Sequence, residues 1–421
     1  MNKIKFGTDG WRAIIGQEYT TDNVARVSIA VANWLNEKYQ KPSVVIGHDC
    51  RFAGELFAET AAKVLASKGV LVKMSKGFVT TPMVSLGVVK EKTDLGVVIT
   101  ASHNPPSYNG YKLKGNFGGP LLQDDINDIE IRIPEFNSVD YVSISIEDLV
   151  NSGRLIYVDL EDIYCTHVKS SFDLNSIRNS KMNFAYDAMF GAGMNAMKKL
   201  LPKATFLHCD NNPGFLGVSP EPIHRNLLEF SNLMKENPID CGLATDGDAD
   251  RIGLYNSSGN FIDSHHIILL LIHYLVKYKG LSGKVVTAFS CSVKVAQLCK
   301  HYGLDHEIVQ IGFKHIAGKM VKEDVLLGGE ESGGIATAGH IPERDGIWMG
   351  LILFEFMSKS GKSLDDLIAE VYEIVGPFAF ERIDLHIDND LIFINFGNKI
   401  PYLNVNGCTT SCNCITLDNN T

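Results

Sequence analysis

Apolar β-branched runs alternate with helical patterns along most of the chain. Apolar residues recur at helical spacing over residues 24–34, after Thr21 and Asp22, which are suitable N-cap residues. Further strands are expected at residues 44–46, 70–74 and 95–100, and a further helix at residues 56–65. This alternation is typical of a mainly parallel sheet with crossover helices.

The same alternation returns twice more. A second unit has expected strands at residues 183–187, 204–209 and 241–245, and helices at residues 193–201 and 225–236. A third unit has expected helices at residues 265–278 and 293–302, and strands at residues 284–289 and 325–328. We therefore expect an α/β fold with three consecutive α/β domains whose mixed, mainly parallel sheets surround a shared cleft.

We place the domains at residues 1–150, 151–258 and 259–370, and expect a C-terminal remnant at residues 371–421. Residues 400–421 have Asn, Cys and Thr in place of periodic apolar positions, so no complete domain is expected there.

Composition excludes several classes of protein. The chain of 421 residues is 45% apolar and 21% charged, an ordinary balance for a folded protein. Its net charge of −10 and its scattered basic residues argue against a nucleic-acid partner. The longest apolar run, Ile267 to Val276, is far below the roughly 20 residues needed to cross a bilayer, so it is expected to be a buried helix.

The N-terminus lacks the apolar segment and cleavage site of a signal peptide, and no cysteines have paired CxxC spacing. We therefore expect a cytoplasmic protein with reduced thiols and no membrane association. The sequence leaves monomer and homodimer equally open.

Ser102 is the candidate nucleophile. It follows an expected strand and opens a turn rich in Pro and Gly, Thr-Ala-Ser-His-Asn-Pro-Pro-Ser-Tyr-Asn-Gly-Tyr-Lys at residues 100–112. A serine hydroxyl needs a base or cations to react, and His103 and Lys112 lie in the same loop. The glycines of a hydrolase nucleophile elbow are missing. The alternative is a turn serine that only caps backbone groups.

Asp246, Asp248 and Asp250 form a candidate metal site, because a curled loop can turn carboxylates at this spacing toward one hard cation such as Mg²⁺. The same spacing opens an EF-hand loop, but Arg251 and Ser257 replace its glycine and its glutamate. A solvated acidic turn is the alternative, although three close carboxylates repel one another without a cation.

Other loops offer groups for substrate. Gly-Gly-Glu-Glu-Ser-Gly-Gly at residues 328–334 could hold sugar hydroxyls, or could be a backbone turn only. Arg344 precedes an expected helix and would add a cation. Arg12 could reach a phosphoryl group through its planar fork of donors, and Arg51 ends another strand. Either Arg12 or Arg51 could instead pair with a surface carboxylate.

Taken together, these segments resemble the α-D-phosphohexomutase superfamily, the phosphoglucomutases and phosphomannomutases, from about residue 5 to about residue 380. The serine loop, the Asp-Gly-Asp-Ala-Asp-Arg loop and the Gly-Glu-Glu-Ser-Gly-Gly loop occur in the family's order. The resemblance implies an intramolecular phosphotransferase that interconverts hexose 1-phosphate and hexose 6-phosphate through phosphoserine and a bisphosphorylated sugar. Glucose is the first expectation and mannose the second, and the sequence leaves glucosamine open as a further alternative. Mg²⁺ and hexose 1,6-bisphosphate are the implied cofactor and activator.

The resemblance also implies a role for each site residue. Ser102 would carry the phosphoryl group and complete the Mg²⁺ shell of Asp246, Asp248 and Asp250. The residues implied in proton transfer are Arg12, Lys112 and His103. The residues implied around the substrate are Glu330 and Ser332, which would hold sugar hydroxyls, and Arg251, Lys314 and Arg344.

One family feature does not occur in this sequence. The Arg-Pro-Ser-Gly-Thr-Glu-Pro-like loop of the family's fourth domain, which clamps the non-reacting phosphate, is absent. Residues 371–386 resemble the beginning of that domain, but the rest of the tail does not continue it, so an incomplete fourth domain is expected. Loss of the loop is expected to weaken substrate binding and to let the bisphosphate escape. Two alternatives therefore stay open: a Mg²⁺-dependent sugar phosphatase with Asp246 as nucleophile, and a non-catalytic sugar-phosphate binding protein.

Overall fold

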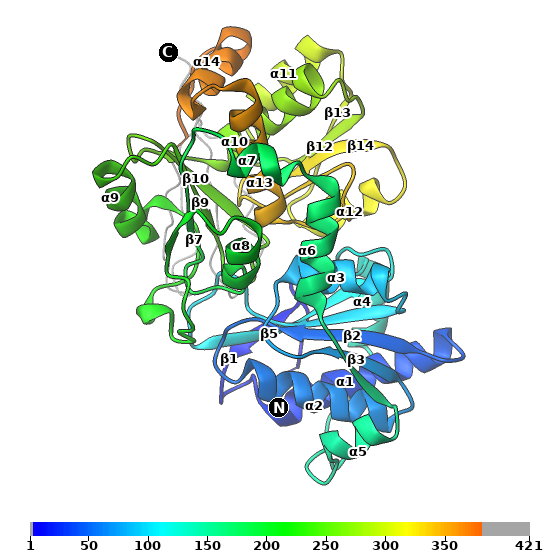
Figure 1. Cartoon of the computed structure of the whole chain (residues 1–421). Helices are drawn as coiled ribbons and strands as arrows, with labels where there is room; N and C mark the ends of the chain where they lie inside the picture. Colours follow the sequence, from blue (N-terminus) through cyan, green and yellow to red (C-terminus); the bar gives the residue numbers. More distant parts are fainter. Residues whose placement is uncertain (1–2, 381–421) are drawn as a thin grey trace, which may run out of the picture.

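A computed structural model describes residues 3–380 of the chain. It contains three mixed, mainly parallel β-sheets with associated helices, which confirms the predicted α/β class (Figure 1). Residues 381–421, which hold most of the expected fourth-domain remnant, lie outside the described residues. Among residues 3–380, no helix combines the length and the apolar character needed to cross a bilayer.

The first sheet has the strand order β1-β5-β4-β2-β3-β6. Strands β4, β2, β3 and β6 run parallel, whereas β5 pairs antiparallel with β4, and β1 pairs antiparallel with β5. The strands are β1 (Trp11–Ile14), β2 (Ser43–His48), β3 (Leu71–Ser75), β4 (Leu95–Ile99), β5 (Tyr108–Gly115) and β6 (Leu155–Val158). The sheet thus continues past the boundary expected at residue 150, because the short and largely exposed β6 pairs in parallel with β3.

Helices cover both faces of this sheet. The helices of this region are α1 (Thr21–Lys38), α2 (Gly54–Ser67), α3 (Thr81–Lys90), α4 (Gln123–Glu130) and α5 (Ile146–Asn151). Val44 and Ile46 share a buried cluster with Phe57 of α2, whereas Val45 packs with Met83 of α3 on the opposite face. The N-cap of α1 is Thr20, one residue before the predicted Thr21, because its side chain accepts the amide of Asn23.

The second sheet has the order β11-β10-β9-β7-β8. Its strands are β7 (Phe184–Asp187), β8 (Thr205–Leu207), β9 (Cys241–Thr245), β10 (Ile252–Asn256) and β11 (Phe261–Ile262). Its helices are α6 (Leu160–Ser171), α7 (Leu174–Arg178), α8 (Met194–Leu200) and α9 (Leu228–Glu236), with short 3-10 turns at Phe215–Gly217 and His224–Asn226. Because β11 pairs with β10, this sheet also extends beyond the expected boundary at residue 258.

The third sheet has the order β13-β12-β14-β15. Its strands are β12 (Lys284–Ala288), β13 (His306–Val309), β14 (Val325–Gly329) and β15 (Ile335–Thr337). The helices of this region are α10 (Ser264–His273), which continues into a π-helical turn (Tyr274–Tyr278), α11 (Lys294–Tyr302), α12 (Phe313–Met320), α13 (Gly346–Ser360) and α14 (Leu364–Val375). Every residue of α10 is buried, as its apolar run predicts.

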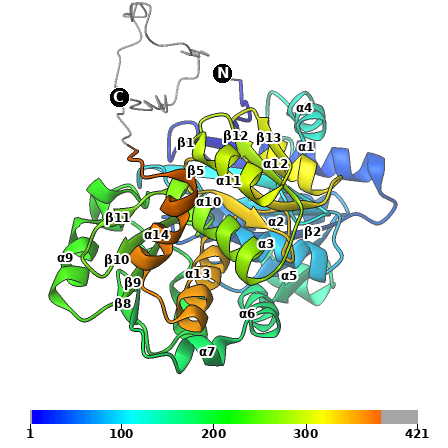
Figure 2. The same ribbon diagram turned by 90° about the horizontal axis from the view of Figure 1, so that it is seen from above.

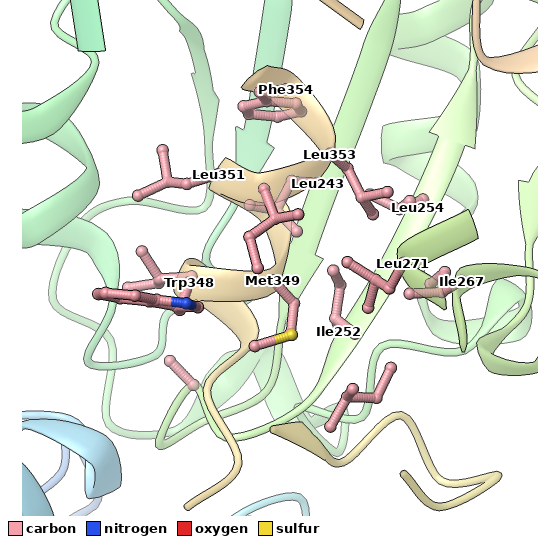
Figure 3. Packing of buried hydrophobic residues seen from close by; sticks show 14 of the residues in the cluster. Leu243, Ile252, Leu254, Ile267, Leu271, Trp348, Met349, Leu351, Leu353 and Phe354 are labelled. Atoms are coloured by element: carbon pink, nitrogen blue, oxygen red, sulfur yellow. The ribbon is translucent and has the colours of Figure 1, made fainter. Parts of the chain in front are cut away.

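Helix α13 joins the second and third units. It follows the third sheet in the sequence, but its side chains pack on the second sheet and on α10 (Figure 3). In that view Met349 and Leu353 of α13 lie among Leu243 of β9, Leu254 of β10 and Leu271 of α10. The view from above shows the same helix between the two units (Figure 2). One continuous core therefore holds these units together.

In all three sheets the motif loop joins two neighbouring antiparallel strands. In each sheet a parallel strand ends on a motif loop, and the chain returns as an antiparallel strand. The pairs are β4 and β5 around Ser102, β9 and β10 around Asp246, and β14 and β15 around Glu330. Ligands of open α/β sheets bind beyond the carboxyl ends of the strands, where these loops lie.

Candidate active site

The serine loop and the acidic loop meet at the centre of the site. Ser102 is 1% exposed, and its Oγ donates a hydrogen bond of 2.6 Å to Asp246 Oδ2. The backbone permits this approach because residue 247 is glycine: a Cβ there would lie 2.6 Å from the carbonyl oxygen of Ser102. Ser102 itself has a φ of +53°, a left-handed conformation that is uncommon for a residue other than glycine.

The acidic triplet has the geometry of a cation site. Asp246, Asp248 and Asp250 are buried, and each offers one carboxylate oxygen within 4.8 Å of the others. The Oδ1 atoms of Asp248 and Asp250 are buried and have no hydrogen-bond partner among the described residues. Buried oxygen ligands without donors fit a hard divalent cation such as Mg²⁺.

Two buried cations contact the triplet. Lys112 of β5 places Nζ 2.8 Å from Asp248 Oδ2 and 3.1 Å from Asp250 Oδ2. Arg344, beside the N-terminus of α13, places Nη2 2.7 Å from Asp250 Oδ2. Burial lowers the pKa of Lys112, but the surrounding carboxylates outweigh it and raise that pKa, so the ammonium stays charged.

The pKa values of Asp246 and Asp248 shift in opposite directions because their partners differ. Burial raises the pKa of Asp246 well above its usual range, and the charges of Asp248 and Asp250 add to the effect. Burial also acts on Asp248, but Lys112 and a hydrogen bond from Thr81 outweigh it and lower its pKa. The site thus separates a readily protonated carboxyl group from a strongly acidic one.

Arg12, His103 and Arg251 lie on the side of the serine loop. Arg12 Nη1 donates 2.6 Å to Asn104 Oδ1, and His103 Nδ1 lies 3.4 Å from Ser102 Oγ. The backbone amide of Arg251 donates to Asp246 Oδ1 at 3.0 Å. Burial lowers the pKa of His103 well below its usual range, and the charges of Arg251 and Arg12 act in the same direction. The imidazole is therefore neutral.

The Glu330 loop is connected to the acidic loop. The amide of Ile252 donates to the carbonyl of Gly333 at 3.2 Å, and the amide of Gly346 donates to the carbonyl of Ala249 at 3.0 Å. Glu330 Oε1 accepts the amide of Gly312 at 2.9 Å. Burial raises the pKa of Glu330 to about 7, although the charge of Arg344 opposes the shift.

Among residues 3–380, neither Ser332 nor Lys314 makes a direct hydrogen bond or ion pair with the triplet. Ser332 is half-buried in the turn that follows Glu330. Lys314 opens α12, donates to Gln123 Oε1, and lines a small cavity that Asp9 also lines. The structure therefore connects Lys314 to the site through the N-terminal loop.

Sequence reasoning missed two residues that organise the site. Asp9 Oδ2 lies 2.9 Å from Lys112 Nζ, contacts Arg344 Nη2, and is 3.9 Å from Arg12 Nη2. Thr81, at the start of α3, donates its hydroxyl to Asp248 Oδ2 at 2.5 Å and its amide to the Asp248 carbonyl at 3.0 Å. The carboxylate in the turn-rich segment before Arg12 was the only sequence signal for Asp9.

Comparisons with known proteins identify the family of the chain. The family descriptions "Phosphoglucomutase/phosphomannomutase, alpha/beta/alpha domain I", "domain II" and "domain III" match residues 3–138, 162–259 and 263–375. The chain is 30% identical over 377 residues to a phosphoglucomutase/phosphomannomutase of Thermococcus kodakarensis, covering 88% of this chain and 80% of the relative.

Two further relatives extend the comparison. A phosphoglucosamine mutase of Caldicellulosiruptor bescii is 30% identical over 381 residues, covering 88% of this chain and 82% of that protein. A crystal structure of a Thermus thermophilus protein assigned as a phosphomannomutase superposes with a TM-score of 0.84 at 32% identity. That superposition covers 92% of this chain and 89% of the other.

Proposed function

The chain belongs to the α-D-phosphohexomutase superfamily, and we propose that it interconverts hexose 1-phosphates and hexose 6-phosphates through a phosphoryl group carried on Ser102. The contact of 2.6 Å between Ser102 Oγ and Asp246 Oδ2 carries this proposal. The buried hydroxyl of Ser102 lies beside the candidate cation-binding triplet and is shielded from water.

The chain's own cations support phosphoryl transfer. Charge on the transferring group spreads over its equatorial oxygens, and fixed cations that are already in place stabilise it. Arg12 and Arg251 lie near His103 on the side of the serine loop, and Lys112 lies on the side of the triplet. Mg²⁺ held by Asp246, Asp248, Asp250 and an oxygen on Ser102 would add charge neutralisation when bound.

The proposed reaction moves one phosphoryl group at a time. The bond from phosphorus to Ser102 Oγ breaks as a bond forms from phosphorus to the free hydroxyl of the hexose phosphate, and that hydroxyl loses its proton. The bisphosphorylated sugar then returns its other phosphoryl group to Ser102. His103 Nδ1, at 3.4 Å from Ser102 Oγ, is placed to accept or return a proton, and Arg12 and Lys112 are the other candidates.

Sugar recognition is assigned to the third unit. Glu330 and Ser332 offer a carboxylate and a hydroxyl to sugar hydroxyls, and Arg344 and Lys314 offer cations to phosphate. We propose glucose phosphates as the first substrate class to test, followed by mannose phosphates. Glucosamine phosphates have to be tested as a third substrate class, because the relatives named above include a phosphoglucosamine mutase.

Mapping the labelled residue tests the proposal. The protein is incubated with Mg²⁺ and glucose 1,6-bisphosphate labelled in phosphate, and the label is located by peptide mapping. We expect phosphoserine at Ser102 that is lost in Ser102→Ala and kept in Ser107→Ala, an exposed serine of the same loop. A hydroxylamine-labile label at Asp246 would instead indicate the phosphatase, and binding without any label the non-catalytic protein.

Turnover is measured separately. Interconversion of the 1- and 6-phosphates of glucose, mannose and glucosamine is compared with a trace of the matching bisphosphate present. We expect the highest kcat/KM for glucose phosphates and no turnover by Ser102→Ala. A higher kcat/KM for glucosamine phosphates would overturn the proposed sugar while leaving the reaction class intact.

A further inference from the structure

Arg51 lies beneath the serine loop and plays no part in the reaction proposed above. It follows β2 and is 3% exposed. Its Nε lies 3.4 Å from Asp49 Oδ2, and neither side chain has any exposed surface, so its partner is a buried carboxylate. A buried arginine is costly unless its donors are used, which directs attention to the remaining nitrogen atoms.

The guanidinium donates to four carbonyl oxygens of one loop. Nη2 donates to the carbonyls of Ser102 and Asn104, both at 2.6 Å. Nη1 donates to the carbonyls of Pro105 at 2.8 Å and of Tyr108 at 3.2 Å. These four carbonyls belong to the turn that carries the nucleophile, so the single guanidinium of Arg51 holds the backbone of this turn in place.

The partner of Arg51 fixes the same loop from the other side. Asp49 Oδ2 accepts the hydroxyl of Thr100 at 2.5 Å, and Thr100 Oγ1 in turn accepts the amide of Ser102 at 2.9 Å. The amide and the carbonyl of Ser102 are therefore both held by the pair of Asp49 and Arg51. Such fixing is what a residue at φ +53° requires, since this conformation persists only where its surroundings determine it.

The second unit covers this arrangement. The ring of Phe215 lies 5.1 Å from the Arg51 guanidinium carbon, and Phe215 is 2% exposed. A cation over an aromatic face is attracted to it, and the ring keeps water from the guanidinium. The carbonyl contacts of Arg51 are thus protected when the first two units are packed together.

We propose that Arg51 is a positioning residue that holds the backbone of Ser102 in the orientation from which its hydroxyl faces Asp246. The proposal rests on the proposed phosphoryl transfer for its effect on rate. Lysine cannot replace this residue, because a single ammonium lacks the rigid fork that reaches carbonyls on two sides. A displacement of about 1 Å of a reacting group costs roughly 100-fold in rate.

The test compares Arg51→Lys with Arg178→Lys in the full chain. Arg178 is a matched control: its Nε and Nη2 donate to the carbonyl of Leu200 at 3.0 and 2.7 Å, in a part of the second unit that carries no site residue. Three quantities are measured: kcat and KM with glucose 1-phosphate, the rate of Ser102 labelling by glucose 1,6-bisphosphate, and amide hydrogen exchange of peptides covering residues 100–110.

We expect Arg51→Lys to lower kcat and the labelling rate about 100-fold, to leave KM within about threefold, and to speed exchange in residues 100–110. Arg178→Lys is expected to change none of these. Wild-type rates and unchanged exchange in Arg51→Lys would overturn the inference. If the wild type takes no label but Arg51→Lys still speeds exchange in this loop, the proposed function fails and the positioning role stands.

Discussion

The hydroxyl of Ser102 donates to Oδ2 of Asp246 at 2.6 Å, although 144 positions separate the two residues along the chain. Ser102 belongs to the loop between β4 and β5, and Asp246 to the loop between β9 and β10. The contact therefore depends on how two different sheets pack against each other. Four predictions concern the groups that maintain this docking.

Removing the ammonium of Lys112 should destabilise the fold. Lys112→Met removes the cation that Asp9, Asp248 and Asp250 have in common and leaves only Asp9 and Asp250 in contact with Arg344. Breaking a buried pair costs about 3–5 kcal/mol. Urea unfolding with and without Mg²⁺ measures the loss, and we expect Mg²⁺ to restore part of it. Lys73→Met, which removes a partly exposed pair with Glu91, is the control and should cost below about 1 kcal/mol.

A side chain at position 247 should separate the two loops. In Gly247→Ala the new Cβ would lie 2.6 Å from the Ser102 carbonyl, so the backbone has to shift. We expect Ser102 labelling to slow roughly 100-fold and the free energy of unfolding to fall by about 1–3 kcal/mol. Gly77→Ala places its Cβ with nothing within 4 Å. Equal behaviour of the two variants would contradict this explanation.

Glu330 should make stability depend on pH in a definite direction. Its pKa rises from 4.5 to about 7 on folding, so its protonated form favours the folded state. That contribution is fully present below pH 4.5 and is lost as the pH rises through 7, by about 3 kcal/mol in total. Glu330→Gln should remove this loss.

Denaturant unfolding of Glu330→Gln and wild type at pH 4 and pH 8 provides the measurement. The variant should gain stability relative to wild type on going to pH 8. Glu236→Gln, an exposed glutamate of α9, should show no such difference. If the difference in the free energy of unfolding between Glu330→Gln and wild type is the same at pH 4 and pH 8, folding does not raise the pKa of Glu330.

Thr81 should affect both metal affinity and stability. Thr81→Val keeps the shape of the side chain but removes the hydrogen bond of 2.5 Å to Asp248 Oδ2. We expect Mg²⁺ affinity to fall about 10- to 100-fold by calorimetry, and the free energy of unfolding by about 1.5–3 kcal/mol. Thr81→Ser retains the hydroxyl and should restore both. Failure of the serine variant to restore them would assign the effect to packing.

The strands that carry the motifs were predictable from the sequence, because each is a mainly apolar run without a charged residue. Strands β4, β9 and β14 fall where the runs at residues 95–100, 241–245 and 325–328 predict them. The antiparallel return strand β5 could not be found in this way. Strand β5 reads Tyr-Asn-Gly-Tyr-Lys-Leu-Lys-Gly, and its buried positions include Lys112 and Lys114, where an apolar residue would be expected.

Buried polar and charged groups also explain why the sequence did not indicate Asp9 and Thr81 as site residues. Lys114 is paired at 2.7 Å with Glu343, and Lys112 with Asp9 and two residues of the triplet, so the charges are buried in pairs. Such pairs join residues that are far apart in the sequence, and no local pattern indicates them. The candidate nucleophile and triplet stood out because each motif concentrates its chemistry within a few positions. The roles predicted for all the site residues, including Arg12, Lys314 and Ser332, stay predictions.

The packing of helix α13 limits which segments can be exchanged in a chimera of two related proteins. Its sequence follows the third sheet, yet Met349, Leu353 and Phe354 fill the core beside β9 and β10. A chimera joined between residues 258 and 259 would pair the second sheet with a foreign helix and expose mismatched apolar surface. Recombination that preserves folding has to transfer the second sheet and α13 together, as a block that ends after Ser360.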